Sequence, residues 1–562
     1  MAESRKTGMS VKELRQFADT LFGKRTPLLS FWQEVAENFY PMRADFTVKR
    51  SLGNDFAGNL MTSYPILCQR DLQEQIGTML RNRNKPWFKM APKDPRDEED
   101  HDLKEWLEWA TGVQRRVMYA PATLFTKATS QGDADYSCFG QAVLTVRMNR
   151  EHDDLLFRCW HLRDVVWIED EAGKICAVFR RWKPDLRTMC RLFDGRPGTS
   201  VHRQVLQDVK KDPSVECDCY HFMVAADLYD GDAKGMPWRS IYYDAAHEHE
   251  MESVAQKRRE YIIPRWLTVS GSQYAHSPAT VAALPEARLL QSMTYTLLEA
   301  GEKIVNPPLI ATEQVVRSDM ALYSGGVTWI DKEYDQRTGD ALSPLLTDAR
   351  GMPLSKDMQM DSRSLIAKCF YLNRLDMPER ASGMSEYEVS QRIQQYIRAA
   401  LPLFEPMEAE YNGSLCEETF GLTFDNGGFG SLMDMPAKIR SASAVEFRFS
   451  SPLHDAVEME RGQKFLEAKQ LLAEAVALDK SAYAILDAKA ALRDALSSIG
   501  VPAKWTRSEA EVIEMERNQA AQQQTAELLA NLAQGAGVAK DLAFAQAAGK
   551  QGGGGGGAAV AA

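Results

Sequence analysis

Residues 384–389 read Met384-Ser385-Glu386-Tyr387-Glu388-Val389 and open a long amphipathic helix. Ser385 and Glu388 have the spacing of a capping box, in which the serine oxygen accepts the amide hydrogen of the third helical residue and the glutamate reaches back to the cap. Apolar residues then recur at helical spacing, at Val389, Ile393, Tyr396, Ile397 and Ala400. Because proline cannot continue a helix, Pro402 and Pro406 should bend it.

A short polar loop is expected just before this helix, over residues 373–384. Pro378 and Gly383 are typical of a connection rather than of a regular element. The loop also carries four charged residues, namely Arg374, Asp376, Glu379 and Arg380. Spacing alone favours an ordinary surface connection between two helices.

Two further helices should bracket a small strand-rich insertion upstream of the loop. The first is expected to begin at Pro285 and to end before Pro307-Pro308, since proline cannot continue the hydrogen-bond ladder. The return helix is expected over residues 357–372. Between them, the sequence predicts short strands such as Val327–Ile330, with a turn at Gly325-Gly326.

The remaining segments divide by periodicity. The first third is mainly helical, with one helix from about Tyr64 to Leu80. From residue 141 the pattern changes to strands, and Val165–Ile168 should pair with Ile175–Phe179 across a turn containing Gly173. The last hundred residues are helical and alanine-rich, and the tail at residues 550–562 should be disordered because glycine loses the most conformational entropy on ordering.

Length and charge limit the possible functions. A chain of 562 residues should form several domains, because single cores rarely exceed roughly 250–300 residues. The formal charge of -11 is the opposite of what a protein that grips nucleic acid electrostatically shows. An acidic surface would instead suit the inner wall of a channel, because it repels duplex DNA and does not hold it in place. No apolar run is long enough to span a bilayer and the start lacks a signal peptide, so the product is expected in the cytoplasm of the cell that makes it.

Enzyme and metal chemistry find little support in the sequence. Nine scattered cysteines favour reduced thiols. The tight cluster Cys217-Asp218-Cys219-Tyr220-His221 could draw a fourth metal ligand from His247-Glu248-His249-Glu250, but a solvated charged loop explains the second segment better. The run Asp97-Glu98-Glu99-Asp100 is expected to be solvated too. Phosphate-loop, nucleophile-elbow and zinc-helix motifs are absent, so we expect no catalytic, cofactor-binding or metal-binding residue.

The opening stretch resembles a Met-Thr-Ala-Thr-Glu-Val pattern of portal proteins, the head-to-tail connecting proteins of short-tailed bacteriophages. Met384, Glu388 and Val389 match, Ser385 stands in for the first Thr, and Glu386-Tyr387 depart. Other stretches resemble the family in the same order along residues 10–520. They are Arg25-Thr26-Pro27-Leu28, Phe31-Trp32, Tyr40-Pro41, Pro86-Trp87-Phe88-Lys89-Met90, Pro264-Arg265-Trp266, Gly271, Tyr274, Ser277-Pro278 and Asn306-Pro307-Pro308-Leu309-Ile310. Ala275 replaces an expected Gly, so the backbone there should be less free.

The resemblance implies an α+β, mainly helical portal fold that assembles as a ring. Its parts would be a wing or body at 1–281 with strands at 141–270, stem helices at 282–306 and 357–372, a clip at 307–356, a tunnel loop at 373–384, a long wing helix with return strands at 385–454, a helical crown at 455–549, and the tail at 550–562. Arg374, Asp376, Glu379 and Arg380 would then face DNA in the channel.

The function implied by this resemblance is structural and non-catalytic. The ring, a dodecamer in the family, would form the capsid vertex through which double-stranded DNA is packaged and ejected. Its partners would be the terminase motor, a tail adaptor, and the major capsid and scaffold proteins, with no cofactor and no membrane. It would be assembled in the host cytoplasm and reside in the virion. The alternatives are a diverged metal-dependent nucleic-acid enzyme and another ring component of the head-tail connector.

Overall fold

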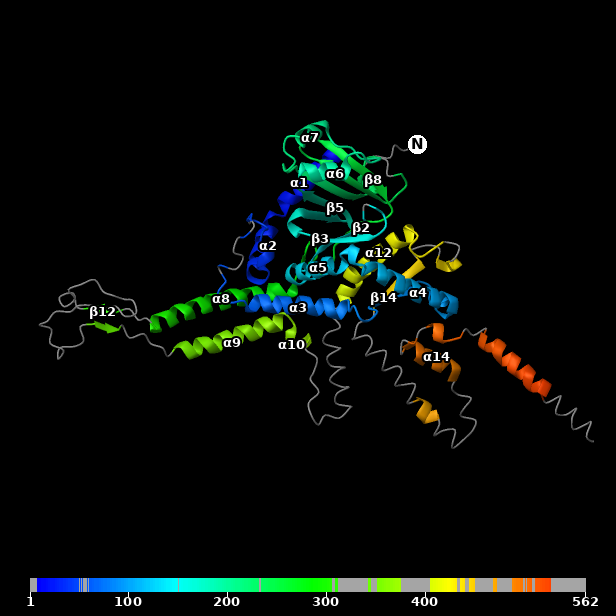
Figure 1. Cartoon of the computed structure of the whole chain (residues 1–562). Helices are drawn as coiled ribbons and strands as arrows, with labels where there is room; N and C mark the ends of the chain where they lie inside the picture. Colours follow the sequence, from blue (N-terminus) through cyan, green and yellow to red (C-terminus); the bar gives the residue numbers. More distant parts are fainter. Residues whose placement is uncertain are drawn as a thin grey trace, which may run out of the picture. The chain divides into compact units, whose positions relative to one another are not determined.

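A computed structural model of the chain describes the following residues: 8–49, 51, 53, 58, 60–149, 151–231, 234–305, 309–311, 342–344, 351–375, 405–431, 435–439, 444–449, 468–472, 488–498, 501, 503–507 and 511–526. The chain divides into two compact units. The larger contains residues 1–90 and 110–457, and the smaller contains residues 91–109 and 458–562. Helices and strands are mixed throughout the described part, as expected for an α+β protein (Figure 1).

The N-terminal part of the larger unit is mainly helical, as the sequence predicts. Helix α1 (Val11–Lys24) starts at a capping box, because Ser10 Oγ accepts the Glu13 amide and Glu13 accepts the Ser10 amide. Helix α2 (Thr26–Phe39) buries its apolar stripe, and α3 (Tyr64–Leu80) confirms the predicted bounds. Helix α4 (His101–Met118) follows, with residues 110–118 in this unit and residues 101–109 in the smaller one. Helix α5 (Phe125–Phe139) is buried at every position from residue 132 to 139.

A five-stranded antiparallel sheet has the order β4 (Val165–Glu169), β5 (Ile175–Trp182), β6 (Cys219–Ala225), β7 (Trp238–Asp244) and β8 (His249–Gln256). The β4–β5 hairpin confirms the predicted pairing, with Val166 opposite Phe179. Side chains alternate between the two faces of β6. Phe222 packs towards α1 in one apolar cluster, while Cys219 joins a second cluster with α6 (Leu186–Phe193) and α7 (Arg203–Asp208).

Smaller sheets complete the strand-rich part of the larger unit. Strands β3 (Leu155–Trp160), β2 (Val143–Met148) and β9 (Tyr261–Ile262) form one antiparallel sheet, and β10 (Leu267–Thr268) pairs with β11 (Ala275–His276). Strand β1 (Phe88–Pro92) pairs with β14 (Val445–Phe449), so two segments far apart in sequence lie together.

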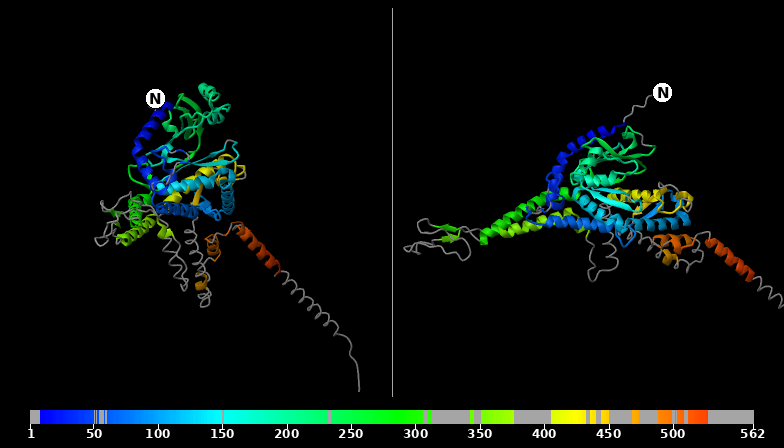
Figure 2. Two further views of the ribbon diagram at one scale, coloured as in Figure 1. Left: turned by 60° about the vertical axis from the view of Figure 1, so that its left-hand side comes forward. Right: turned by 45° about the horizontal axis from the view of Figure 1, so that its top comes forward.

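Helix α8 (Pro278–Val305) runs beside α9 (Gly351–Cys369), and Figure 2 shows this helical hairpin in two views. Strands β12 (Leu309–Ala311) and β13 (Leu342–Pro344) pair beyond it. The prediction that Pro285 begins the first helix is wrong: Pro285 lies inside α8. The sequence was misread because proline is common at a helix start, whereas here the preceding turns are held by burial of Ala279, Thr280 and Ala283.

The return helix also starts earlier than the expected residue 357, since α9 begins at Gly351 and ends at Cys369. A short helix, α10 (Leu372–Leu375), follows it. The strand predicted at Val327–Ile330 and the capped helix predicted from Ser385 lie outside the described residues. The chain is described again from residue 405, through the π-helical segment η7 (Glu408–Gly413) and helix α12 (Ser414–Asp425).

The described C-terminal segments of the smaller unit are helical, as the sequence predicts. The unit contains α14 (Ala488–Ser498), the short 3-10 helix η11 (Ala503–Trp505) and a helical stretch at residues 511–526. The acidic run begins within the 3-10 helix η2 (Pro95–Glu99), where Asp94 accepts the amide hydrogen of Arg96. Among the described residues, no helix is both long and apolar enough to cross a bilayer.

A buried ion pair joins three segments of the larger unit. The guanidinium of Arg81, just after α3, donates to the carboxylate of Asp133 on α5 and to Asn412 Oδ1 in η7 at 2.9 Å. It also lies 4.5 Å from the centre of the Tyr411 ring. Burial raises the pKa of Asp133, and the positive charge of Arg81 opposes that shift. Two buried charges are tolerated here because each satisfies the other.

Replacing Arg81 by Met should leave the Asp133 carboxyl buried without its cation. We expect a loss of about 3–5 kcal/mol in the free energy of unfolding, measured by urea denaturation. Arg70→Met is the matched control, because Arg70 on α3 pairs only at the surface with Glu74 at 3.6 Å and should cost less than about 1 kcal/mol. Equal stability of the two variants would contradict a central role for the buried pair.

Candidate functional site

The helical hairpin α8–α9 and the chain that leaves it form the region where the sequence predicts function. Of the four predicted site residues, only Arg374 lies within the described residues, and it falls in α10 rather than in the loop that was expected. Asp376, Glu379 and Arg380 lie outside the described residues. The structure therefore shows where this segment starts and does not bring the four residues together.

The start of that segment is fixed by the end of α9. Phe370 is fully buried and its ring lies 5.3 Å from that of Phe39 on α2. Tyr371 then takes a left-handed conformation with φ of 60°, which ends the helix before α10 begins. The segment with the predicted charged residues therefore starts from a point that the buried Phe370 holds in the body.

The base of α8 is held against α5 by hydrogen bonds to carbonyl groups at the end of α5. Ser277 Oγ donates to the Ser137 carbonyl at 2.7 Å, and Thr280 Oγ1 donates to the Cys138 carbonyl at 2.8 Å. Gly140 follows with φ of 75°, and a Cβ there would lie 2.1 Å from the carbonyl carbon of His276. Only glycine fits this close approach of two backbones.

The two helices of the hairpin contact each other and the body near their base. Gln359 Nε2 on α9 donates to Thr294 Oγ1 on α8 at 3.3 Å, and Ile366 is fully buried. Gln291 on α8 accepts the amide hydrogens of Met61 and Thr62 at 2.7 and 3.0 Å. The base of the hairpin is therefore part of the folded body.

Beyond Leu290, no residue of α8 is fully buried. Large apolar side chains are exposed instead, with Tyr295 at 57% and Leu298 at 55% of their full accessibility. Further exposed apolar side chains on the two helices are those of Leu289, Val305, Met358, Met360 and Leu365. A pair of helices with this much exposed apolar surface is typical of an interface rather than of a free surface.

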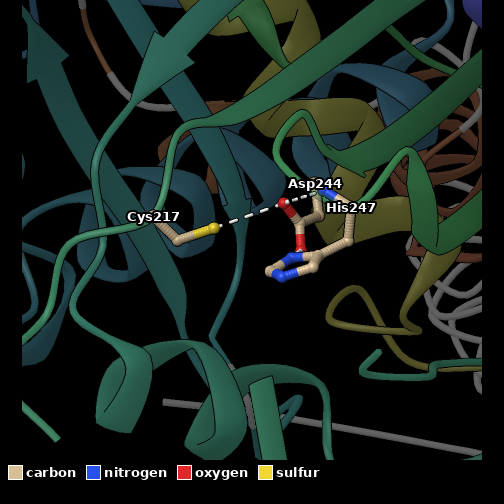
Figure 3. A group of neighbouring side chains, drawn as sticks. All are labelled: Cys217, Asp244 and His247. Atoms are coloured by element: carbon tan, nitrogen blue, oxygen red, sulfur yellow. Dashed lines mark hydrogen bonds and ion pairs between the residues drawn. The ribbon is translucent and has the colours of Figure 1, made fainter. Parts of the chain in front are cut away.

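A second candidate lies at one end of the five-stranded sheet, where Cys217, Asp244 and His247 meet (Figure 3). Asp244 lies between the other two, accepting from Cys217 Sγ at 3.2 Å and contacting His247 Nδ1 at 2.7 Å. A nucleophile–base pair would need the thiol beside the imidazole. Here the Asp244 carboxylate lies between the thiol and the imidazole, so the cluster offers metal ligands but no activated nucleophile.

This cluster only partly follows the sequence pattern. Cys219 and His221 do lie on the same face of β6, as alternation predicts, and His247 does approach Cys217. His221, however, hydrogen-bonds to Tyr261 Oη at 2.6 Å and to Ser240 Oγ at 2.9 Å, and burial lowers its pKa well below the usual range. It is therefore a neutral core residue and not a member of the cluster.

Sequence reasoning missed Asp133 and Asp244. Both are carboxylates that become fully buried, and only the fold shows their partners. A usable signal for Asp133 was its place among small and apolar residues in 132–139, where a solvated aspartate is unusual. Asp244 ends a strand directly before a turn, which gives no comparable signal.

Comparisons with known proteins support the resemblance. A family described as "Bacteriophage head to tail connecting protein" matches residues 11–506. The chain is 23% identical over 412 residues to a "Probable portal protein" of Bordetella phage BPP-1, which covers 71% of each chain. It is also 23% identical over 433 residues to a "Portal protein" of Salmonella phage epsilon15, which covers 75% of each chain.

Replacing Gly140 by Ala should disturb the base of the hairpin. A left-handed conformation costs a residue with a Cβ roughly 1–2 kcal/mol, and the contact with His276 adds to it, so we expect a loss of at least about 2 kcal/mol in unfolding free energy. Gly112→Ala is the control, since nothing lies within 4 Å of its added Cβ and α4 should gain about 0.5–1 kcal/mol. Unchanged stability in Gly140→Ala would refute this account of the joint.

Proposed function

Because the chain belongs to the family of bacteriophage head to tail connecting proteins, we propose that it is a portal protein, the structural subunit of a ring at the capsid vertex through which DNA enters and leaves the head. The observation that carries this proposal is the family match across most of the chain. The two portal relatives, each aligned over more than two thirds of the chain, support it.

In this proposal the α8–α9 hairpin is the stem, and the segment between its helices, with β12 and β13, is the clip that meets tail adaptors and the packaging motor. The sheets and helices up to β11 form the wing. The segment 373–384, which starts within α10, contains the tunnel loop, residues 385–454 form the long wing helix with return strands, and residues 455–549 form the crown. The helix bounds suggest stem helices at Pro278–Val305 and Gly351–Cys369. The first is slightly longer at its body end than the sequence implied, and the second starts earlier at its far end and stops earlier at its body end.

Ring assembly would cover the exposed apolar side chains of the hairpin. Burying a large apolar side chain contributes roughly 1.5–3 kcal/mol, and the distal part of α8 alone exposes Tyr295, Leu298 and Val305. In a closed ring each subunit presents one face of its hairpin to the next, so one repeated contact satisfies every copy. We propose a dodecamer on the basis of the family resemblance.

The proposed mechanism is geometric rather than catalytic. A subunit with a net charge of -11 would repel duplex DNA, so the channel would guide it without holding it. The positive side chains of the loop would make weak, salt-sensitive contacts with passing phosphates. Capsid and scaffold proteins would contact the body, while the terminase motor would supply ATP hydrolysis from a separate chain.

The purified protein should form rings with a central hole, visible by negative-stain electron microscopy. Replacing Tyr295 and Leu298 together by Glu should prevent assembly and leave a folded monomer of 63.1 kDa, because charge would be placed in an apolar contact. The control Tyr295→Phe with Leu298→Met keeps the surface apolar and should still form rings. A wild-type monomer at every concentration and salt, by light scattering, would refute the proposal.

Reversing the two positive charges of the segment 373–384, by Arg374→Glu with Arg380→Glu, should leave rings intact and reduce the DNA content of packaged heads. The reason is that phosphate contacts in the channel would become repulsive. Arg374→Lys with Arg380→Lys keeps the charge and should package normally. Normal DNA content with the reversed charges would remove the loop from the mechanism.

A further inference from the structure

Cys217, Asp244 and His247 come from three neighbouring segments of the five-stranded sheet. Cys217 lies two residues before β6, Asp244 is the last residue of β7, and His247 lies in the turn that leads to β8. One donor atom from each lies within 4.8 Å of the other two. The strand pairing brings them together, because Asp244 lies opposite Cys219 at the start of β6.

The carboxylate at the centre of this cluster is already oriented. Asp244 is fully buried, and its Oδ1 accepts the amide hydrogens of Ala246 at 3.0 Å and His247 at 3.3 Å. The same oxygen accepts from Cys217 Sγ, while Oδ2 contacts the His247 ring. The turn between β7 and β8 therefore holds the three side chains in one place without any ion.

We propose that this cluster binds a divalent ion of the zinc class through Cys217 Sγ, an Asp244 oxygen and His247 Nδ1. Zinc lies about 2.0–2.3 Å from such donors, which places tetrahedral donors roughly 3.5 Å apart. To admit the ion, the contacts of 3.2 and 2.7 Å to Asp244 open by less than about 1 Å, and the donor atoms of Cys217 and His247, which lie within 4.8 Å of each other, take the same spacing. On binding, the Cys217 thiol releases its proton to solvent, and the His247 ring gives up the Nδ1 proton that faces Asp244 Oδ2 and carries its proton on Nε2 instead.

The type of donor selects the ion. One thiol, one imidazole and one carboxylate suit zinc and similar transition metals, whereas magnesium and calcium require several oxygen donors. This set is also unlike the carboxylate-rich sites of metal-dependent nucleases, which cleave nucleic acid with two ions. The site is therefore structural in character.

The surroundings fit an ion held at the edge of the body. On one side lies the apolar cluster that contains Cys217, Cys219 and Met251. On the other, His247 is partly exposed, and the ring of His202 at the start of α7 stacks on it at 4.8 Å. Cys219, from the same cluster, would complete the coordination and close the site, as in structural zinc sites. The ion would tie the segment before β6 to the β7–β8 turn.

The test uses the full-length protein, stripped with a chelator and then titrated with zinc against a competing indicator. We expect about one tightly held zinc per chain, a higher melting temperature with zinc, and a thiolate-to-cobalt charge-transfer band when cobalt replaces zinc. Cys217→Ser and His247→Ala should each weaken zinc binding by at least tenfold and abolish the thermal shift. Because His247 is partly exposed in a turn, His247→Ala should fold even if Cys217→Ser does not.

Cys176→Ser is the matched control. Cys176 on β5 donates to the Ile168 carbonyl and is outside the cluster, so its loss should change neither zinc affinity nor the cobalt band. The proposal would be overturned if the stripped wild-type chain bound no zinc in the titration. It would equally be overturned if both cluster variants bound zinc as tightly as the Cys176 variant.

Discussion

The buried pair of Arg81 and Asp133 is the interaction on which the larger unit depends. Each charge would be very costly to bury alone, so the end of α3, the middle of α5 and the η7 segment must come together as a set. Helix α5 is thereby fixed in the body, and its last carbonyl groups then hold the start of α8. The position of the hairpin thus follows from an ion pair that lies outside it.

Two kinds of surface result from this arrangement. Near the body, the hairpin is held by hydrogen bonds and buried side chains, so its direction is determined within one chain. Farther out, the same helices expose apolar residues that one chain does not cover. A subunit built for assembly needs both, because a contact between copies is specific only if each copy presents it at a defined angle.

The sequence predicted elements with a clear period or a clear stop. Helix α3 and the β4–β5 hairpin were found because apolar spacing and a turn glycine define them. Helix α5 was not, since its second half, residues 132–139, is buried on all sides and has no amphipathic period. The start of α8 was misplaced because local proline preference was outweighed by tertiary burial. Likewise, spacing rules could not join Cys217 to Asp244, which only strand pairing brings together.

Pro285 gives α8 a mechanical property. Proline removes one helical hydrogen bond and tends to kink the helix, and it stands close to Leu290, the last fully buried residue before α8 leaves the body. A helix of 28 residues is about 42 Å long. A change of 5° at this proline would therefore swing the far end by roughly 2–3 Å, given about 30 Å of helix beyond it. A small bend at Pro285 is therefore amplified along α8 into a displacement of several ångströms at its far end.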